Sequence, residues 1–349
     1  MSGTGAITQL IALGQQDVHI TGSPEISFFV SRFKRHTNFS IFQQQQTIQS
    51  NPSAGGTSTV TFRRSGDLLN YVFMTVIDNE TSKLVSDWSD IISKCELLIG
   101  DQVIDTQHVE FTEEIAPDLL SSSYAKSYQA GHHGGSGSSS YFYPFRFFHC
   151  ESWTSSLPII SLQYSDVRYR ITWSDSLNAS YQIKIFATYA ALDDIERKKF
   201  ALNKFEMPIF QVQRQEPSHE LVQNLYFNHP IKFIASSNVS GESNLVSITN
   251  QVHLEVNGTD ITEKVKGVPF FTSVPSYYHT EYSDSTAENL FFYPFCINAS
   301  KNQLTGSLNF SRLDSFRIHC TERINKAVYG VNWNFLRIEN GIGGLLYAD

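Results

Sequence analysis

Tyr141-Phe142-Tyr143-Pro144-Phe145 returns later in the chain as Phe291-Phe292-Tyr293-Pro294-Phe295. Each copy is followed by a polar turn and then by a second matching stretch. That stretch begins Leu162-Gln163-Tyr164-Ser165 in the first half and Leu308-Asn309-Phe310-Ser311 in the second, and both continue to an Arg-Ile pair. The distance between the copies far exceeds the roughly 20–50 residues of solenoid repeats. The repeat therefore indicates that one whole domain was duplicated and fused.

The composition favours β-structure. The 349 residues are 41% hydrophobic, and aromatic residues reach 13%, with 26 Phe and 16 Tyr. Such side chains suit pleated, half-buried surfaces, and the length allows two domains that each bury a core. The formal net charge of −8 argues against a protein that coats nucleic acid, because neutralising phosphates needs clustered Lys and Arg.

The four cysteines, Cys95, Cys150, Cys296 and Cys320, form no Cys-x-x-Cys pair and lack the neighbouring His spacing of a zinc site. No basic stretch followed by a sustained apolar run stands near the start, so no secretory signal is predicted. No apolar run approaches the ~20 residues of a membrane span. We therefore expect four reduced, mostly buried thiols in a reducing compartment.

Short β-rich segments and turn signals recur in both halves. One hairpin is predicted to turn at Gly100-Asp101 and a matching one at Asn257-Gly258, a dipeptide typical of a type I′ turn. Many short strands, given twice, predict an all-β protein of two consecutive antiparallel jelly rolls (β-sandwiches) with short helices in loops and linker. The expected divisions are an N-terminal arm over residues 1–23, a first jelly roll over 24–192, a linker helix over 193–206 and a second jelly roll over 207–349.

Three segments interrupt the strands. Residues 86–93 carry apolar side chains at helical spacing and predict a short helix. Residues 110–129 are expected to be partly helical, with an interruption at Pro117. The charged run at 193–205 contains no Gly or Pro, which favours a linker helix. Asp193-Asp194 is best explained as the capped N-terminus of that helix rather than as a pair of catalytic acids.

Candidate chemical sites are weak. His132-His133 lies in the Gly/Ser-rich stretch 131–140, and no carboxylate or third His stands at a fixed spacing from it, so a flexible loop is the better interpretation. No His-Glu-x-x-His, Gly-x-Ser-x-Gly or Walker motif occurs, nor does the His-x-His and Glu cluster of cupins. We therefore predict no catalytic, cofactor-binding or metal-binding residues and no enzymatic activity.

Seven Asn-x-Ser/Thr sequons are present. A chain rich in Asn and Ser produces them by chance, and without a secretory signal they would not meet the glycosylating enzyme. We therefore keep them as possible N-glycosylation sites but do not expect them to be modified. The sequon residues are Asn38, Asn79, Asn178, Asn238, Asn257, Asn298 and Asn309.

Several segments, taken in order, resemble one known family. The most specific are Val328–Ile338 and the following Gly341-Ile342-Gly343-Gly344-Leu345. The others are Gly14–Pro24, Phe28–Phe39, Arg64–Leu68, Glu96–Asp105, Leu157–Tyr164, Phe227–Lys232 and Asn309–Asp314. Together they resemble the double jelly-roll major capsid proteins of nucleocytoplasmic large DNA viruses. The chain is short for that family, so we expect trimmed surface loops.

The resemblance implies a structural capsid protein that forms homotrimeric, pseudo-hexagonal capsomers in an icosahedral virion shell and assembles in the host cytoplasm. It implies self-association as the main partnership, with minor capsid proteins or an inner membrane reached through the N-terminal arm. Ile7, Leu10, Ile11 and Leu13 would supply the apolar contact. No cofactor and no direct nucleic-acid contact is expected. The alternatives are a minor capsid paralogue and a virion carbohydrate-binding or adhesion module, which would need a polar and aromatic pocket on loops.

Overall fold

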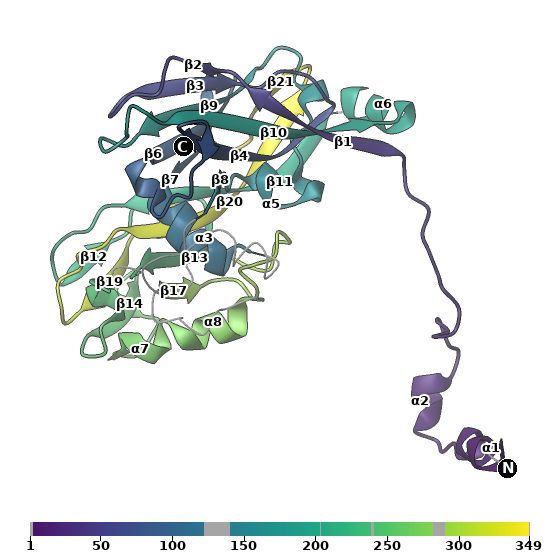
Figure 1. Cartoon of the computed structure of the whole chain (residues 1–349). Coiled ribbons are helices and arrows are strands. Elements are labelled where there is room, and N and C mark those ends of the chain that lie inside the picture. Colours follow the sequence, from purple (N-terminus) through teal and green to yellow (C-terminus); the bar gives the residue numbers. More distant parts are fainter. Residues whose placement is uncertain (1–2, 122–139, 203, 239–240, 282–289, 349) are drawn as a thin grey trace. The chain divides into compact units, whose positions relative to one another are not determined.

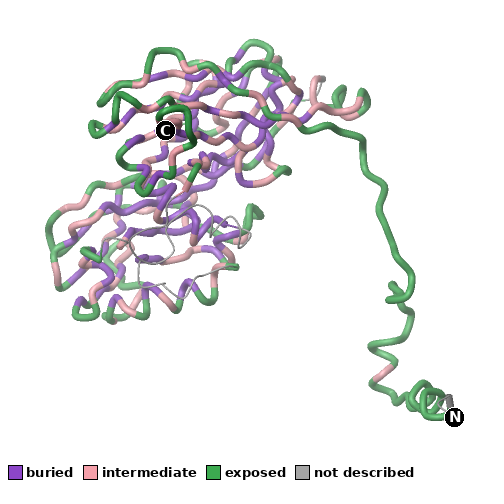
Figure 2. Tube along the Cα trace, viewed as in Figure 1, coloured by how far each residue is buried: buried purple, intermediate pink, exposed green. Residues whose placement is uncertain are grey.

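The computed structural model describes residues 3–121, 140–202, 204–238, 241–281 and 290–348 (Figure 1). It divides into two units, Met1–Asn38 and Phe39–Asp349. The first unit contains the short helices α1 (Gly3–Ile11) and α2 (Asp17–Thr21). Its residues 24–38 form no strand and are exposed (Figure 2), so the arm as a separate unit runs past residue 23 to Asn38.

The first jelly roll consists of two antiparallel sheets. One has the order β1 (Phe39–Gln46), β10 (Gln182–Leu192), β4 (Leu68–Asp78) and β5 (Thr81–Ser82), with β8 (Phe142–Pro144) also paired to β4. The other has the order β2 (Ile48–Gln49), β3 (Thr57–Thr61), β9 (Val167–Trp173), β6 (Ile92–Ile99) and β7 (Gln102–His108).

The second jelly roll repeats this arrangement. One sheet has the order β11 (Phe205–Gln215), β20 (Val328–Glu339), β13 (Pro230–Ser237) and β17 (Leu290–Pro294), with β18 (Leu308–Asn309) on β13 and β21 (Ile342–Leu345) on β20. The other has the order β12 (Val222–Asn224), β19 (Phe316–Cys320), β14 (Gln251–Val256) and β15 (Thr259–Asp260), with β16 (Val265–Lys266) also on β14. The strands β1, β10, β4 and β8 thus correspond to β11, β20, β13 and β17. The predicted fold class is confirmed.

Turn chemistry and side-chain alternation explain the strands. Gly100, between β6 and β7, has a φ of +63°, which glycine adopts without steric cost. Asn257 and Gly258 have φ values of +49° and +79°, as a type I′ turn requires at both central positions. Along β9 every second residue is buried, so one face of that strand points into the core.

The strand β20 departs from this alternation. Its residues 328–334 are buried without interruption. One face of β20 packs into the core of the second jelly roll, which includes Val328. The other face, with Tyr329, Val331 and Trp333, belongs to the core of the first. In the buried part of the Val328–Ile338 motif, apolar Tyr329, Val331 and Trp333 alternate with Asn332 and Asn334, whose side-chain amides are satisfied by Gln211 and Gln213.

The helices differ from the sequence expectation in two places. The helix predicted over residues 86–93 is wrong, because η1 (Trp88–Asp90) is a single 3₁₀ turn and β6 already begins at Ile92. In the next segment, η2 (Phe111–Ile115) is π-helical and leads into α3 (Ala116–Leu119). Pro117 stands in the first turn of α3, where a missing N–H is tolerated, so it does not interrupt the helix.

The linker contains a helix, α6 (Asp194–Leu202), and the Glu196 N–H donates to Asp193 Oδ1 over 2.9 Å, as expected of a cap. His132-His133 and the rest of residues 131–139 lie outside the described part of the chain. The remaining short helices are α5 (Phe148–Glu151), η3 (Trp153–Ser155), η4 (Ile159–Ser161), η5 (Asn244–Val246), α7 (Gly267–Phe270), α8 (Ser273–His279) and η7 (Phe310–Arg312).

The repeated aromatic motif occupies the same place in both barrels. Pro144 ends β8 opposite Phe73, and Pro294 ends β17 opposite Phe233, so neither proline interrupts a central strand. The Phe145 ring lies 5.0 Å from the ring of Tyr169 on β9. The equivalent Phe295 ring lies 5.9 Å from the ring of Phe316 on β19. The duplication therefore preserves the packing of each barrel as well as its topology.

The two phenylalanines differ in burial. Phe145 is only 3% exposed, whereas Phe295 is half-buried. We predict that Phe145→Ala lowers the free energy of unfolding by roughly 3–5 kcal/mol, because a large buried ring leaves a cavity. Phe295→Ala should cost clearly less. Denaturant unfolding of both variants tests this, and equal losses would contradict the difference in packing.

Candidate functional site

The two barrels meet where two sheets end. Among the described strands, β7 pairs only with β6, and β11 pairs only with β20. The free edges of β7 and β11 face each other, and the Val212 N–H of β11 donates to Oδ1 of Asp105 on β7 over 2.8 Å. Gln211 Nε2 donates to the Ile104 carbonyl oxygen beside it. Side chains thus satisfy backbone groups that an unpaired edge would leave open.

We call the contact between the facing edges of β7 and β11 the seam. Asp105 is its central group. Its carboxylate also accepts from the Thr106 N–H over 2.9 Å and from Gln107 Nε2 over 2.8 Å. Burial raises its pKa to about 7, and the hydrogen bonds from Val212, Gln107 and Thr106 oppose that rise. The carboxyl group is therefore close to its midpoint of ionisation near neutral pH.

A second contact is made by the segment that follows β7. Tyr329 on β20 donates to Oε2 of Glu110 over 2.6 Å and accepts from Nε of Arg214 over 3.0 Å. The ring of Phe111 lies 5.7 Å from that of Tyr329. Ser300 Oγ donates to the Leu119 carbonyl oxygen over 3.2 Å. The helices η2 and α3 of the first barrel therefore cover the outward face of the second (Figure 1).

The end of the second barrel closes the seam from the other side. The Gly343 N–H of β21 donates to Ser165 Oγ over 3.3 Å, and the Leu345 N–H donates to Gln102 Oε1 over 3.0 Å. A Cβ atom on Gly343 would lie 2.5 Å from Cδ2 of the buried Leu162, so any other residue would force that side chain to shift. The glycine-rich motif at 341–345 therefore holds the end of the second barrel against the first, and we call this contact the clamp.

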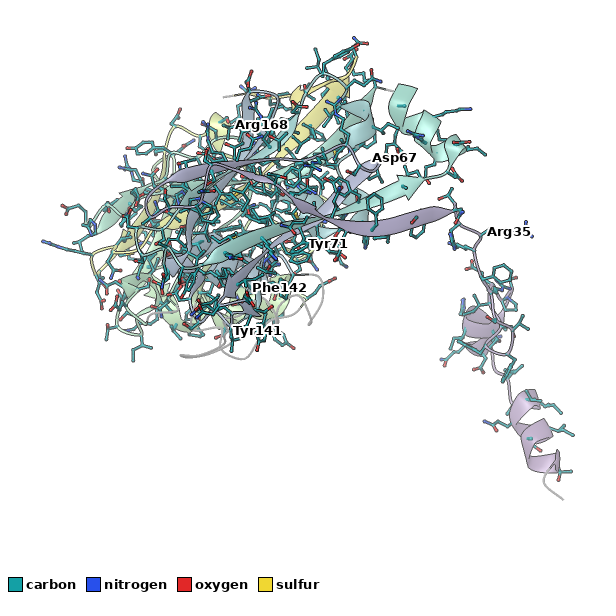
Figure 3. All side chains as sticks on the ribbon, turned by 45° about the horizontal axis from the view of Figure 1, so that its top comes forward. Arg35, Asp67, Tyr71, Tyr141, Phe142 and Arg168 are labelled. Atoms are coloured by element: carbon teal, nitrogen blue, oxygen red, sulfur yellow. The ribbon has the colours of Figure 1, made fainter. Side chains whose placement is uncertain are left out.

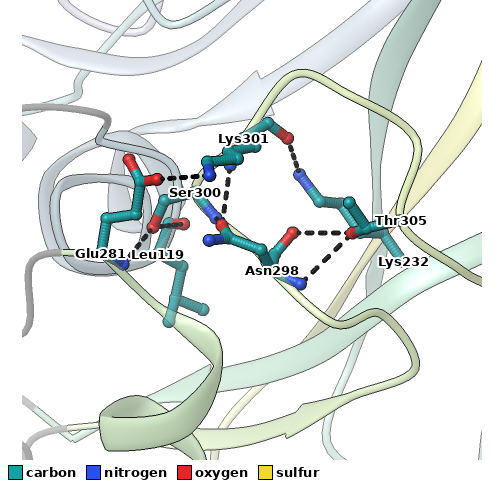
Figure 4. A network of polar contacts seen from close by, with 7 residues as sticks. All are labelled: Leu119, Lys232, Glu281, Asn298, Ser300, Lys301 and Thr305. Atoms are coloured by element: carbon teal, nitrogen blue, oxygen red, sulfur yellow. Dashed lines mark hydrogen bonds and ion pairs between the residues drawn. The ribbon is translucent and has the colours of Figure 1, made fainter. Parts of the chain in front are cut away.

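A buried lysine lies close to this interface (Figure 4). Lys232 is 2% exposed, and its Nζ donates to the Lys301 carbonyl oxygen over 2.9 Å and lies 5.0 Å from the centre of the Trp333 ring. Burial lowers its pKa to about 8. Asn298 Oδ1 accepts from the N–H groups of Ser300 and Lys301, which holds the loop in place. Nothing in the sequence around Lys232 marks it as buried.

The sequon asparagines serve local turns. Asn38, Asn79, Asn178, Asn257 and Asn309 are exposed, whereas Asn238 and Asn298 are half-buried. Oδ1 accepts backbone N–H groups at five of the seven positions. Four of these bonds lie within a local turn, as is common for Asn, and Asn257 accepts from Asp314, 57 positions later. These five are Asn178, Asn238, Asn257, Asn298 and Asn309.

The cysteines are free thiols in the structure, with Cys95, Cys296 and Cys320 buried and Cys150 half-buried. Burial raises the pKa of Cys320 to about 12, so that thiol stays protonated at neutral pH. Within the described residues, no three His, Cys, Asp or Glu side chains are grouped in a way that could hold a metal ion. The same part of the chain contains no helix long and apolar enough to cross a membrane.

An aromatic groove of about 690 Å³ lies on the first barrel. Two of its lining residues, Tyr71 and Phe142, are labelled in Figure 3. Residues of β4 and β8 and the segment from α5 to η3 form its walls. Tyr71 packs edge-to-face on Trp153 with ring centres 5.8 Å apart, and Phe73 on Phe142 at 6.0 Å. The sequence did not predict this groove, because its walls come together only when β8 pairs with β4.

Two barrels with one topology, locked edge to edge, define a double jelly-roll protein. The chain matches the model described as major capsid protein N-terminus over residues 27–207 and that described as large eukaryotic DNA virus major capsid protein over 235–344. It therefore belongs to the major capsid protein family of large eukaryotic DNA viruses, and the resemblance seen in the sequence is confirmed.

Comparisons with individual proteins lead to the same family. The chain is 27% identical to a major capsid protein of Pyramimonas orientalis virus and 24% identical to one of Paramecium bursaria Chlorella virus 1, covering 99% of this chain and 100% of each relative. The fold is similar to the PBCV-1 virus capsid (TM-score 0.75, 22% identity, 93% of this chain and 100% of that chain). It is also similar to the Faustovirus major capsid protein (TM-score 0.67, 10% identity, 94% of each chain).

Substitutions at Asp105 should reveal its role in the seam. We predict that Asp105→Ala lowers the free energy of unfolding by roughly 1–3 kcal/mol, because the Val212 N–H loses its acceptor. Asp105→Asn keeps an acceptor and serves as the control. The folded-state pKa lies above the ordinary Asp value of about 3.9, so the contribution of Asp105 is lost as the pH rises through about 7. Wild type should thus lose stability relative to Asp105→Asn as the pH rises from about 4 to about 7 in denaturant titrations, and a constant difference over that range would refute this.

Lys232 should contribute a pH dependence of stability opposite in sign to that of Asp105, and Lys232→Met should remove it. The folded-state pKa of Lys232 lies below its ordinary value, so the wild type becomes more stable as the pH rises from about 8 to 10.5. The variant lacks this gain, which amounts to roughly 2–3 kcal/mol at about 1.4 kcal/mol per pKa unit. Urea unfolding of both proteins at pH 7 and 10 measures the difference. An unchanged difference between the two pH values would exclude a buried ammonium group.

Proposed function

We propose that this chain is the major capsid subunit of an icosahedral virion shell and that three copies form a pseudo-hexagonal capsomer. The observation that carries the proposal is the strand-for-strand equivalence of the two barrels, which the seam holds in one arrangement. A threefold axis acting on two similar barrels generates six similar lateral faces. Such a ring approximates a hexagon, the shape that tiles a flat facet. Membership of the major capsid protein family supports the same function.

The proposal extends to location and partners. The chain would act in the virion shell after assembly in the host cytoplasm, as a structural component without catalysis. The arm is the candidate contact for minor capsid proteins or an inner membrane, because Ile7, Leu10 and Ile11 lie at helical spacing on α1 and are exposed. The net charge of −8 supports a role without direct nucleic-acid contact.

We predict that the purified chain is a homotrimer whose subunit pairs bury on the order of 2,000–5,000 Å², the range of obligate interfaces. Sedimentation equilibrium at micromolar concentration gives the mass, and electron microscopy of the same sample should show particles with a hexagonal outline. A stable monomer would overturn the proposal. If that monomer also bound glycans in a screen, a carbohydrate-binding module would replace it.

A further inference from the structure

We propose that the aromatic groove on the first barrel receives α7 and α8 of a second copy of this chain. The inference rests on the trimer proposed above and names the surfaces that would form it. Its basis is a contact already present inside one chain, between the first barrel and the second. The duplication predicts that the same contact recurs between the second barrel of one copy and the first barrel of the next.

The contact within the chain buries an aromatic pair. Phe233 on β13 and Phe292 on β17 point outward from the second barrel, pack edge-to-face with ring centres 5.5 Å apart, and are both 0% exposed. They belong to the same apolar core as Phe111, Ile115 and Leu119 of η2 and α3. The first barrel therefore buries this pair with the segment that follows β7.

In the described part of the chain, no segment covers the equivalent pair on the first barrel in this way. Pro144 opposite Phe73 matches Pro294 opposite Phe233, so the registers make Phe73 equivalent to Phe233 and Phe142 equivalent to Phe292. The angle between the ring planes is 79° in both pairs. Phe73 and Phe142 are only half-buried, however, and line the groove. The groove is thus the first barrel's counterpart of a surface that is fully covered on the second.

The second barrel carries the matching element, and among the described residues no segment of the first barrel covers its outer side. The helices α7 and α8 follow β16 as η2 and α3 follow β7. Phe270 on α7 is 51% exposed, and Val274, Tyr277 and Tyr278 on α8 are 41%, 78% and 72% exposed. The spacing of the three α8 residues places them along one side of that helix. Figure 1 places α3 between the barrels and α7 and α8 on the far side of the second barrel. Exposed apolar side chains grouped in this way are typical of an interface.

Both halves of this contact are aromatic, and the contact is heterologous. The two surfaces that meet are different: α7 and α8 of the second barrel on one copy, and the aromatic groove of the first barrel on the other. Each copy therefore has one surface of each kind. A heterologous contact closes into a ring when its rotation divides a full turn. If the step from the second barrel to the next first barrel repeats the step inside the chain, six barrels and three copies close the ring.

The first test compares three variants by sedimentation equilibrium. Tyr277→Ala combined with Tyr278→Ala removes two exposed aromatic rings of α8, and Tyr71→Ala removes part of the wall of the aromatic groove. Each should raise the dissociation constant of the trimer by about tenfold or more, since aromatic anchors dominate interfaces. Tyr226→Ala is the matched control, because Tyr226 is 75% exposed but belongs to neither surface, and it should leave the trimer unchanged. Circular dichroism establishes that every variant is folded.

The second test locates the contact directly. A photo-crosslinking amino acid replaces Tyr71, and the protein is mixed with an isotopically heavy copy before irradiation. We expect crosslinks from position 71 to residues 267–281 of the other copy. A wild-type trimer with crosslinks elsewhere, or with an unchanged dissociation constant in the variants, would overturn this inference and leave the proposed capsid function intact. A wild-type monomer would overturn both.

Discussion

The arrangement of this protein depends on how two unpaired strand edges are satisfied. The strands β7 and β11 each lack a neighbour on one side, and a carboxylate from one accepts the N–H of the other. A continuous sheet across the seam would have made one twisted structure, whereas two uncovered edges would invite pairing with other chains. Asp105 holds the barrels side by side as separate sandwiches, so the angle between them is a fixed property of the folded chain.

Duplication preserved the interior more strictly than the exterior. Inside the barrels, Tyr143 and Phe145 have counterparts in Tyr293 and Phe295, with ring centres 5.3 Å and 5.4 Å apart. The cross-strand ion pair of Arg170 with Glu96 also recurs, as Arg317 with Glu255. The outward faces differ. The face of the second barrel that carries Phe233 packs against the first barrel, whereas the equivalent face of the first barrel, which carries Phe73, lines the groove. The pseudo-symmetry is therefore a property of packing, and the differences between the halves follow from their different neighbours.

The sequence contains enough information for the fold and too little for the seam. Alternating strands, the Asn257-Gly258 turn and the doubled aromatic motif all depend on neighbours close in the chain, so they could be predicted. Trp88 and Ile92 stand at helical spacing in the sequence, but a 3₁₀ turn and a strand bury them separately, so the helix expected there does not form. Asp105 and Val212 are 107 positions apart, and no local pattern indicates such a partner. The burial of Lys232 could not be predicted for the same reason, since Lys301 and Trp333, which contact its ammonium group, are 69 or more positions away.

The clamp formed by β21 also has a consequence for synthesis. Gly343 binds Ser165, a residue 178 positions earlier, so the loop at Ser165 leaves the ribosome long before the strand that fastens it. The strands of the first barrel emerge during that interval, but the bonds from Gly343 to Ser165 and from Leu345 to Gln102 form only when residues 342–345 have emerged. Chains interrupted before that point lack the clamp, and the geometry that assembly requires is thereby restricted to chains translated through the second barrel.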